Sequence, residues 1–210
     1  MKDLFVFTAD SDAEAVLRAM LRRHKDLGIR EISVDVRRFV GRDSGMVKDG
    51  PEIAWELVNK KEYRNLILIW DHHGSGWEQH TPDLACDRIK QRLDSCTWTG
   101  RSDAVVAVPE IEEWIWCSRN SVAKHLGLNA AALAERLAQA SRKSGTAPDQ
   151  LMKSDPKELF ESVLYATLRR RPPPDDFAAI TTHANVSSWG RSQSFSLLLN
   201  TLKRWFPSNQ

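Results

Sequence analysis

Three short apolar runs without polar alternation constrain the fold of this chain more than any other feature of its sequence. They are residues 4–8 (LFVFT), 65–70 (NLILIW) and 103–109 (DAVVAVP). Such a run is typical of a strand that is buried on both faces, as the strands of a parallel sheet are. The sequence therefore predicts a parallel β-sheet.

Stretches with helical spacing of apolar residues separate these runs. Helices are predicted over 12–26, 51–60 and 82–94, and a more exposed, alternating strand over 31–39. The glycine-containing segment 41–51 is expected to be a loop, because Pro51 suits the first turn of a helix. Strand–helix alternation of this kind predicts an α/β core over residues 1–117.

The strand signals stop near residue 118. Helices are predicted over 119–126, 129–142, 156–170 and 192–206, with breaks at 144–148 and 169–176. We therefore expect a second, helical part, residues 118–210, packed on the α/β core.

The composition excludes several classes of protein. Of the 210 residues, 41% are hydrophobic and 28% are charged, which suits a folded core and argues against a disordered chain. The net charge of +2 is too small to indicate nucleic-acid binding by itself, although a local basic patch is compatible with it. The sequence has no run near the roughly 20 apolar residues that span a bilayer, no recognisable signal peptide and no C-x-x-C spacing among its cysteines. We expect a cytoplasmic protein without a membrane partner.

Acidic residues follow each of the three apolar runs. Asp10 and Asp12 follow the first run, Asp71 the second, and Glu110 and Glu112 the third. Because the carboxyl ends of parallel strands meet at one edge of the sheet, where ligands bind, we expect these carboxylates to lie together. A carboxylate cluster is unfavourable unless a cation neutralises it, so the pattern predicts a metal site.

A histidine is expected to join this cluster. His73 has the same strand parity as Asp71 and so points the same way, whereas His72 points away and is expected to be structural. Carboxylates with an imidazole suit Mg²⁺ or Mn²⁺, and such ions promote phosphodiester hydrolysis. We expect Asp71, His73, Glu110 and Asp10 to form the catalytic centre, with Asp12 and Glu112 as further metal ligands.

Local structural roles compete with this prediction. Asp10 and Asp12 are equally suited to cap the first helix, and capping does not exclude metal binding. Glu110 and Glu112 would also be favourable at the positive end of a following helix, and Glu113 is expected to face solvent.

Basic residues are scattered, with one group around the predicted loop. This group consists of Arg37, Arg38, Arg42 and Lys48. A solvated surface is the simpler interpretation. If these side chains lie on the same side as the acids, they would form a track for phosphate groups.

Six short elements occur in a characteristic order. They are FVFTADSDAEAVL, LIWDHHG, CDRIKQRL, VPEIEEW, SDPKELF and RSQSFSLLLNTL. Together they span nearly the whole chain and resemble a TOPRIM-type catalytic domain, in particular an uncharacterised TOPRIM-related family among bacterial defence and mobile-element proteins. The resemblance implies a TOPRIM-like (Rossmann-like) parallel-sheet core followed by a helical C-terminal subdomain.

TOPRIM domains hold Mg²⁺ with a glutamate after the first strand and an Asp-x-Asp pair, and they cut or join nucleic-acid strands. By this resemblance Asp71 matches the first aspartate of the pair, His73 stands in place of the second, and Glu110 and Glu112 match a further E-x-E element. The first-strand glutamate has no match, and Asp10 or Asp12 would substitute for it. The resemblance implies a divalent-metal-dependent nuclease that acts on DNA or RNA phosphodiesters in prokaryotic anti-phage defence, with other defence-system proteins as further partners.

Two alternatives remain open. Because two of the three standard TOPRIM acids are altered, the chain could be a catalytically degenerate binding or partner subunit of a defence complex. The elements DSDA and WDHHG also resemble the DHH phosphoesterases, which bind Mn²⁺. Against that resemblance, the stretch 31–39 ends without an acid and no Gly-Gly-Gly-His run follows.

Overall fold

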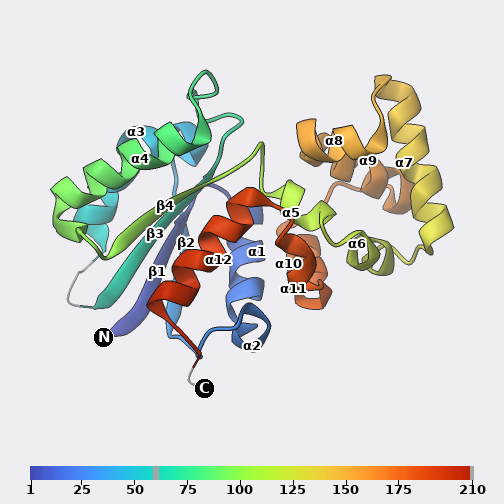
Figure 1. Cartoon of the computed structure of the whole chain (residues 1–210). Helices are drawn as coiled ribbons and strands as arrows, with labels where there is room; N and C mark the ends of the chain where they lie inside the picture. The colour runs from blue at the N-terminus through green and yellow to red at the C-terminus, as the bar shows by residue number, and fades with distance from the viewer. Residues whose placement is uncertain (59–61, 209–210) are drawn as a thin grey trace.

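The computed structural model describes residues 1–58 and 62–208 and contains a four-stranded parallel sheet (Figure 1). The strands are β1 (Lys2–Thr8), β2 (Val34–Arg38), β3 (Tyr63–Asp71) and β4 (Ser102–Ala107), in the spatial order β2-β1-β3-β4. Every neighbouring pair is parallel. The predicted parallel α/β sheet is therefore confirmed, and the core is Rossmann-like.

Helices cover both faces of the sheet. α1 (Ser11–Leu21) and α12 (Gln193–Trp205) lie on one face, and α3 (Arg42–Leu57) and α4 (Pro82–Leu93) lie on the other (Figure 1). In β1, Leu4 and Val6 belong to the first of these cores, whereas Phe5 and Phe7 belong to the second. Because both faces are buried at β1, β3 and β4, these three strands show no polar alternation, whereas the edge strand β2 alternates and is partly exposed.

Helix α3 contradicts one prediction: residues 42–50 are helical, and Pro51 lies inside the helix rather than at its start. A proline in a helix leaves the carbonyl four residues earlier without its usual donor. Here that carbonyl belongs to Val47, and Arg92 of α4 donates to it at 2.5 Å. The side chain of a distant helix thus makes the proline tolerable. The end of the predicted helix 51–60, residues 59 and 60, lies outside the described residues.

The four helices predicted for the C-terminal part are confirmed as α6 (Arg119–His125), α7 (Ala130–Ser144), α9 (Pro156–Leu168) and α12. The predicted helix 12–26 is divided in the structure: α1 ends at Leu21, and a separate short helix, α2 (His24–Leu27), follows. The helix considered after the third apolar run is present as α5 (Glu112–Trp116). Further helices were not predicted: the π-helix η1 (Asp94–Trp98), α8 (Pro148–Ser154), α10 (Pro174–His183) and α11 (Val186–Trp189). Helix α10 begins inside the predicted break 169–176, because Pro174 occupies its first turn, where a proline is favourable.

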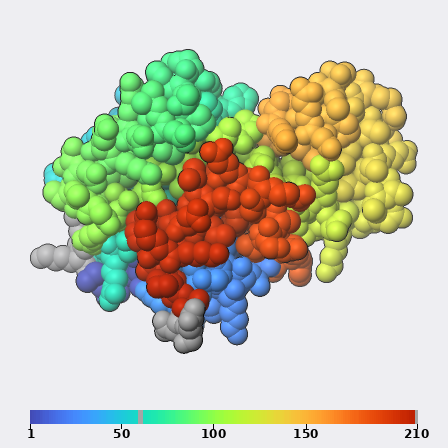
Figure 2. Space-filling model, in the orientation of Figure 1, coloured from blue at the N-terminus to red at the C-terminus, as the bar shows by residue number. Residues whose placement is uncertain are grey.

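The C-terminal half of the chain has two locations. Helices α6–α9, which we call the lobe, lie beside the sheet, and the chain then returns through α10 and α12 to the α/β core (Figure 1). Figure 2 shows the last helix (red) on the surface of the molecule, with N-terminal residues (blue) on one side and green segments on the other, and this helix packs against β4. One hydrophobic core includes Leu4 of β1, Trp114 of α5 and Phe160 of the lobe. The domain boundary near residue 117 stays a prediction. No helix among the described residues is long and apolar enough to cross a membrane.

Candidate functional site

The acidic residues that follow the strands gather at the carboxyl edge of the sheet. Asp71, the last residue of β3, lies near enough to Glu112, Asp10, Asp43 and Glu110 for each of their charges to act on it. We call these five residues the acidic cluster. Four of them were predicted. The fifth, Asp43, was missed because its segment was expected to be a loop.

Asp71 lies at the centre of this cluster. Its side chain is buried, with 6% of the residue exposed, and its Oδ1 accepts a hydrogen bond from the backbone N–H of Ile111 at 2.9 Å. Its own N–H donates to Oδ1 of Asp43 at 2.8 Å. Burial, and then the negative charges of Glu112 and the other cluster acids, raises the pKa of Asp71 well above its usual value. Asp71 thus connects the ends of β3 and β4.

Glu110 and Glu112 lie at the turn from β4 into α5. Glu112 is only 1% exposed, and neither of its carboxylate oxygens has a hydrogen-bond partner among the described residues. Oε2 of Glu110 is also buried and has no hydrogen-bond partner among the described residues. Burial raises the pKa of Glu112 to about 8, against the attraction of Lys157. Leaving such oxygens buried and unpaired is costly, so the site favours the binding of a proton or a cation.

One lysine from the lobe reaches the cluster. Nζ of Lys157, near the start of α9, lies 4.0 Å from Oε1 of Glu112, and its side chain is 35% exposed. Burial opposes the charge of this lysine, but Glu112, Asp10 and Asp71 outweigh it and raise the pKa of Lys157. Lys157 was not predicted as a site residue, although it is the lysine of the element SDPKELF. That element was its only signal in the sequence.

The two aspartates after β1 differ in role. Asp10 caps α1, because its Oδ1 accepts a hydrogen bond from the N–H of Ala13 at 2.7 Å. Its charge still acts on Asp71, so it is both a cap and a member of the acidic cluster. Burial, followed by repulsion from Asp10, raises the pKa of Asp12 to about 6. Asp12 lies beside the acidic cluster rather than at its centre.

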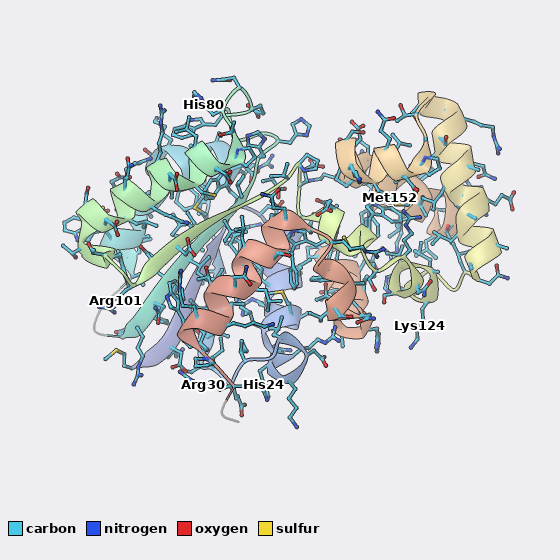
Figure 3. All side chains as sticks on the ribbon, in the orientation of Figure 1. His24, Arg30, His80, Arg101, Lys124 and Met152 are labelled. Atoms are coloured by element: carbon cyan, nitrogen blue, oxygen red, sulfur yellow. The ribbon has the colours of Figure 1, made fainter. Side chains whose placement is uncertain are left out.

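The paired histidines point in different directions. Nδ1 of His73 lies 3.4 Å from Oε1 of Glu110, and its side chain is 61% exposed, so it lies at the rim of the cluster. His72 turns into the loop that follows, where its Nε2 lies 3.1 Å from the carbonyl oxygen of His80. Figure 3 labels His80 in that loop, at the opposite end of the molecule from Arg30 and His24.

The chemistry of the cluster suits a hard divalent cation, but its arrangement is not that of a formed metal site. Carboxylate oxygens are the ligands that Mg²⁺ and Mn²⁺ prefer, and the unpaired oxygens of Glu110 and Glu112 are available donors. However, no three His, Cys, Asp or Glu side chains in the described part of the chain are placed to hold a metal ion. The cation that lies against the cluster in this structure is the ammonium of Lys157.

A cleft of about 450 Å³ opens beside the cluster, which we call the charged cleft. It is lined by the acidic residues Asp10, Asp12 and Asp43 and by the basic residues Arg38, Arg42 and Lys157. Two arginines of the predicted basic group therefore lie on the same side as the acids. A space with both kinds of charge can accept a phosphate group next to a carboxylate-bound cation.

Comparisons of the chain with protein-family models, with curated proteins and with solved structures found no match. Fold and site together define the chain as a parallel α/β protein with a buried acidic cluster at the carboxyl edge of its sheet.

Proposed function

We propose that this chain is a divalent-metal-dependent, nuclease-like protein that acts on nucleic-acid phosphodiesters. The observation that carries the proposal is the acidic cluster, in which Asp71, Glu110 and Glu112 converge with three buried oxygens that lack a hydrogen-bond partner among the described residues. The TOPRIM-like order of sequence elements supports the same activity. A role in prokaryotic anti-phage defence rests on that resemblance alone.

The ligands of the cation would come from the predicted residues. Asp71, Glu110, Glu112 and Asp10 would hold Mg²⁺ or Mn²⁺, with Asp12 and His73 as outer members of the set. Such an ion supplies an activated water and positive charge against the phosphate. The N–H of Ile111 fixes the orientation of the Asp71 carboxylate, so the central ligand is already in place.

The basic residues would bind the substrate. Arg38 and Arg42 line the charged cleft and can hydrogen-bond to phosphate oxygens. Lys157 is partly exposed, so it can turn from Glu112 towards a phosphate once a divalent cation neutralises the acids. His73, exposed beside Glu110, is the candidate proton donor to the leaving oxygen.

The direct test is a cleavage assay on single- and double-stranded DNA and RNA with Mg²⁺, Mn²⁺ or EDTA. Asp71→Asn retains an acceptor for the N–H of Ile111 but removes the charge, so we expect at least about a 100-fold loss of cleavage with the fold preserved. Asp175→Asn, an exposed aspartate at the start of α10, is the matched control and should cleave normally. Cleavage that survives Asp71→Asn, or that proceeds in EDTA, would remove the cluster from the reaction.

A degenerate partner subunit is the second candidate, and one observation favours it. Lys157 already lies against the acids, and the described residues show no three-ligand metal arrangement. This candidate predicts no cleavage of any substrate and no calorimetric binding of Mg²⁺ or Mn²⁺ at millimolar concentrations. Calorimetric titration of the Lys157→Met variant with Mg²⁺ or Mn²⁺ separates a degenerate site from an intact site that Lys157 blocks. An intact set of carboxylates should bind the ion more tightly once the ammonium is gone, whereas a degenerate set should still not bind it.

The DHH-type phosphoesterase remains a third candidate and also has one observation in its favour. Its pattern requires another acid after a strand between the two matching elements. β2 itself ends without one, but Asp43, five residues beyond its end, joins the cluster and hydrogen-bonds to the N–H of Asp71. A strict preference for Mn²⁺ over Mg²⁺ in the cleavage assay would favour this candidate.

A further inference from the structure

A second cavity lies where the chain enters the lobe and where it returns from it. One wall comes from residues 117–124, which lead from α5 through α6, and the other from residues 183–191, which follow α10 and include α11. We call this cavity the junction pocket. Its volume is about 600 Å³, within the range of roughly 300–1,000 Å³ that is usual for small-molecule sites.

The charge of its lining sets the junction pocket apart from the charged cleft. Three cationic side chains line it, those of Arg119, Lys124 and Arg191, and within the described ranges no aspartate or glutamate does. The charged cleft, in contrast, has as many acidic as basic lining residues. The junction pocket therefore favours an anion.

Hydrogen bonds between the two walls hold the pocket in shape. Oγ of Ser121 donates to the carbonyl oxygen of His183 at 3.1 Å, and the N–H of Asn185 donates to Oγ of Ser118 at 3.3 Å. Ser118 and Ser121 are buried, and their hydroxyl oxygens lie 2.9 Å apart. Because both walls are fixed before a ligand arrives, binding would cost little ordering of the protein.

Arg191 is fixed in the same way. Its Nε donates to the carbonyl oxygen of Ser188 at 3.2 Å, and its Nη2 donates to that of Cys117. The residue is exposed, and its Nη1 makes no hydrogen bond within residues 1–58 and 62–208. A guanidinium that is held on one side and free on the other is preorganised to bind an oxyanion.

The neighbouring acids do not neutralise the pocket. Lys124, which Figure 3 labels below α6, is exposed and forms no ion pair in the described part of the chain. Arg119 pairs with Asp149 of α8 at 2.8 Å, but the side chain of Asp149 is 79% exposed, so solvent and salt weaken this pair. Glu113 is close enough for the charge of Arg191 to act on it, but it is not part of the lining.

Neutral donors complete the site. Oδ1 of Asn185 accepts hydrogen bonds from the N–H and the hydroxyl of Ser187, which leaves its amide nitrogen free to donate. Asn120 is exposed, and its side chain makes no hydrogen bond among the residues that the structure describes. A phosphomonoester has three terminal oxygens and a charge near −2, which match these amides and the cations better than a singly charged carboxylate does.

We propose that the junction pocket binds a small phosphorylated molecule with a polar body, such as a sugar phosphate. Lys124 and Arg191 would bind the phosphate, and Asn120 and Asn185 would donate to its oxygens or to hydroxyl groups of the sugar. The body is polar because no aliphatic, phenyl or indole side chain lines the pocket within the described residues. This inference does not depend on the acidic cluster.

The test is calorimetric titration in a phosphate-free buffer with EDTA, with ribose 5-phosphate as the probe. We expect a Kd below about 1 mM for ribose 5-phosphate and no binding of ribose. Lys124→Glu reverses one exposed charge, so its melting temperature should be unchanged and its affinity at least about 10-fold weaker. Asn120→Asp, which places an acid in the lining, is a second variant and should weaken binding in the same direction.

Two control variants locate the binding. Lys143→Glu, at an exposed lysine of α7, makes the same charge change outside the pocket and should bind ribose 5-phosphate as the wild type does. Arg42→Glu changes the charged cleft and should also leave the affinity unchanged. Loss of binding in Arg42→Glu but not in Lys124→Glu would assign the phosphate to the charged cleft and overturn the proposal.

Three other results would also overturn it. The first is unchanged affinity in both Lys124→Glu and Asn120→Asp, and the second is the absence of binding at about 10 mM ribose 5-phosphate, ten times the weakest Kd expected. The third is binding of a short single-stranded oligonucleotide that Lys124→Glu abolishes, without binding of ribose 5-phosphate. The pocket would then bind the backbone of a nucleic acid rather than a small ligand. Cleavage activity enters none of these measurements, so failure of the nuclease proposal would leave this one standing.

Discussion

Two buried aspartates on neighbouring strands of the sheet have opposite surroundings. Asp71 ends β3 and Asp103 lies near the start of β4, and each is 6% exposed. Asp103 forms ion pairs with the ammonium of Lys90 at 2.8 Å and with the guanidinium of Arg204 at 3.7 Å. It also accepts a hydrogen bond from the hydroxyl of Thr201. Asp71 instead lies among four other carboxylates.

The comparison separates a structural carboxylate from a candidate functional one. Around Asp103 the cations outnumber the acid, and they connect β4 to α4 and α12. Around Asp71 the acids outnumber Lys157, and buried oxygens of Glu110 and Glu112 lack a hydrogen-bond partner within the described residues. A buried carboxylate with cationic and hydroxyl partners can serve the fold alone, whereas a buried excess of one charge is characteristic of binding and catalytic sites.

The largest effect on stability should come from removing Lys157, the lysine that lies against the acidic cluster. Lys157→Met leaves the buried acids without their cation, so we expect the free energy of unfolding at pH 8 to fall by about 3 kcal/mol in EDTA. Millimolar Mg²⁺ should restore much of this loss, since it binds the folded state only. Urea denaturation with and without Mg²⁺ measures both quantities. A variant as stable as the wild type in EDTA would show that Lys157 does not neutralise the cluster.

Removing the satisfied aspartate should have a smaller effect, on stability alone. Asp103→Ala leaves the buried hydroxyl of Thr201 and the N–H of Ala104 without their acceptor, which costs about 2 kcal/mol. Lys90 and Arg204 are exposed enough to be solvated instead. Cleavage per folded molecule should remain within about 3-fold of the wild type. A loss comparable with that of Asp71→Asn would abolish the distinction between the two aspartates.

Glu112 should make its own contribution to the pH dependence of stability. The pKa of Glu112 is raised to about 8 in the folded protein, so the folded state binds more protons than the unfolded state between about pH 4.5 and 8. The stabilisation of the folded state by protonation of Glu112 is therefore complete below this pH window and is lost as the pH rises through it. Glu112→Gln, which has no proton to lose, should melt about 3 °C higher than the wild type at pH 8.5, for roughly 1 kcal/mol.

Thermal unfolding across pH 5 to 9 tests this sign. The difference in melting temperature between Glu112→Gln and the wild type should grow with pH in EDTA and shrink when Mg²⁺ is added. If the melting temperatures of both proteins changed equally with pH, a group other than Glu112 would be responsible for the titration.

The smallest effect is expected at the rim. The His73 side chain is exposed, and within the described part of the chain its contact with Glu110 is what joins it to the cluster. We therefore expect His73→Ala to reduce cleavage by about 10-fold or less and to leave stability unchanged. His72→Ala should destabilise the loop through the contact with His80. Comparison of the two variants by cleavage and by melting temperature checks these assignments. A larger catalytic loss for His72 would reverse them.

Local patterns were sufficient to predict the sheet and most of the acids. A strand buried on both faces can be recognised from its own residues, and the edge at which parallel strands end follows from their direction. Pro51 and Lys157 show where such patterns stop being informative. The helix around Pro51 depends on Arg92, 41 residues later, and Lys157 reaches Glu112 only because the lobe folds back onto α5. Asp43 was missed for the same reason, since its position depends on that helix.

The late return of the chain to the sheet has a consequence for synthesis. α12 covers the face of the sheet next to β4, and Phe195, Leu198 and Leu202 in it are buried in the same core as residues of β1 and α1. A ribosome must therefore deliver the chain as far as α12 before this apolar face is covered, and until then the nascent protein exposes it. A chain shortened to its N-terminal α/β part would keep that face open, and aggregation would be its expected fate.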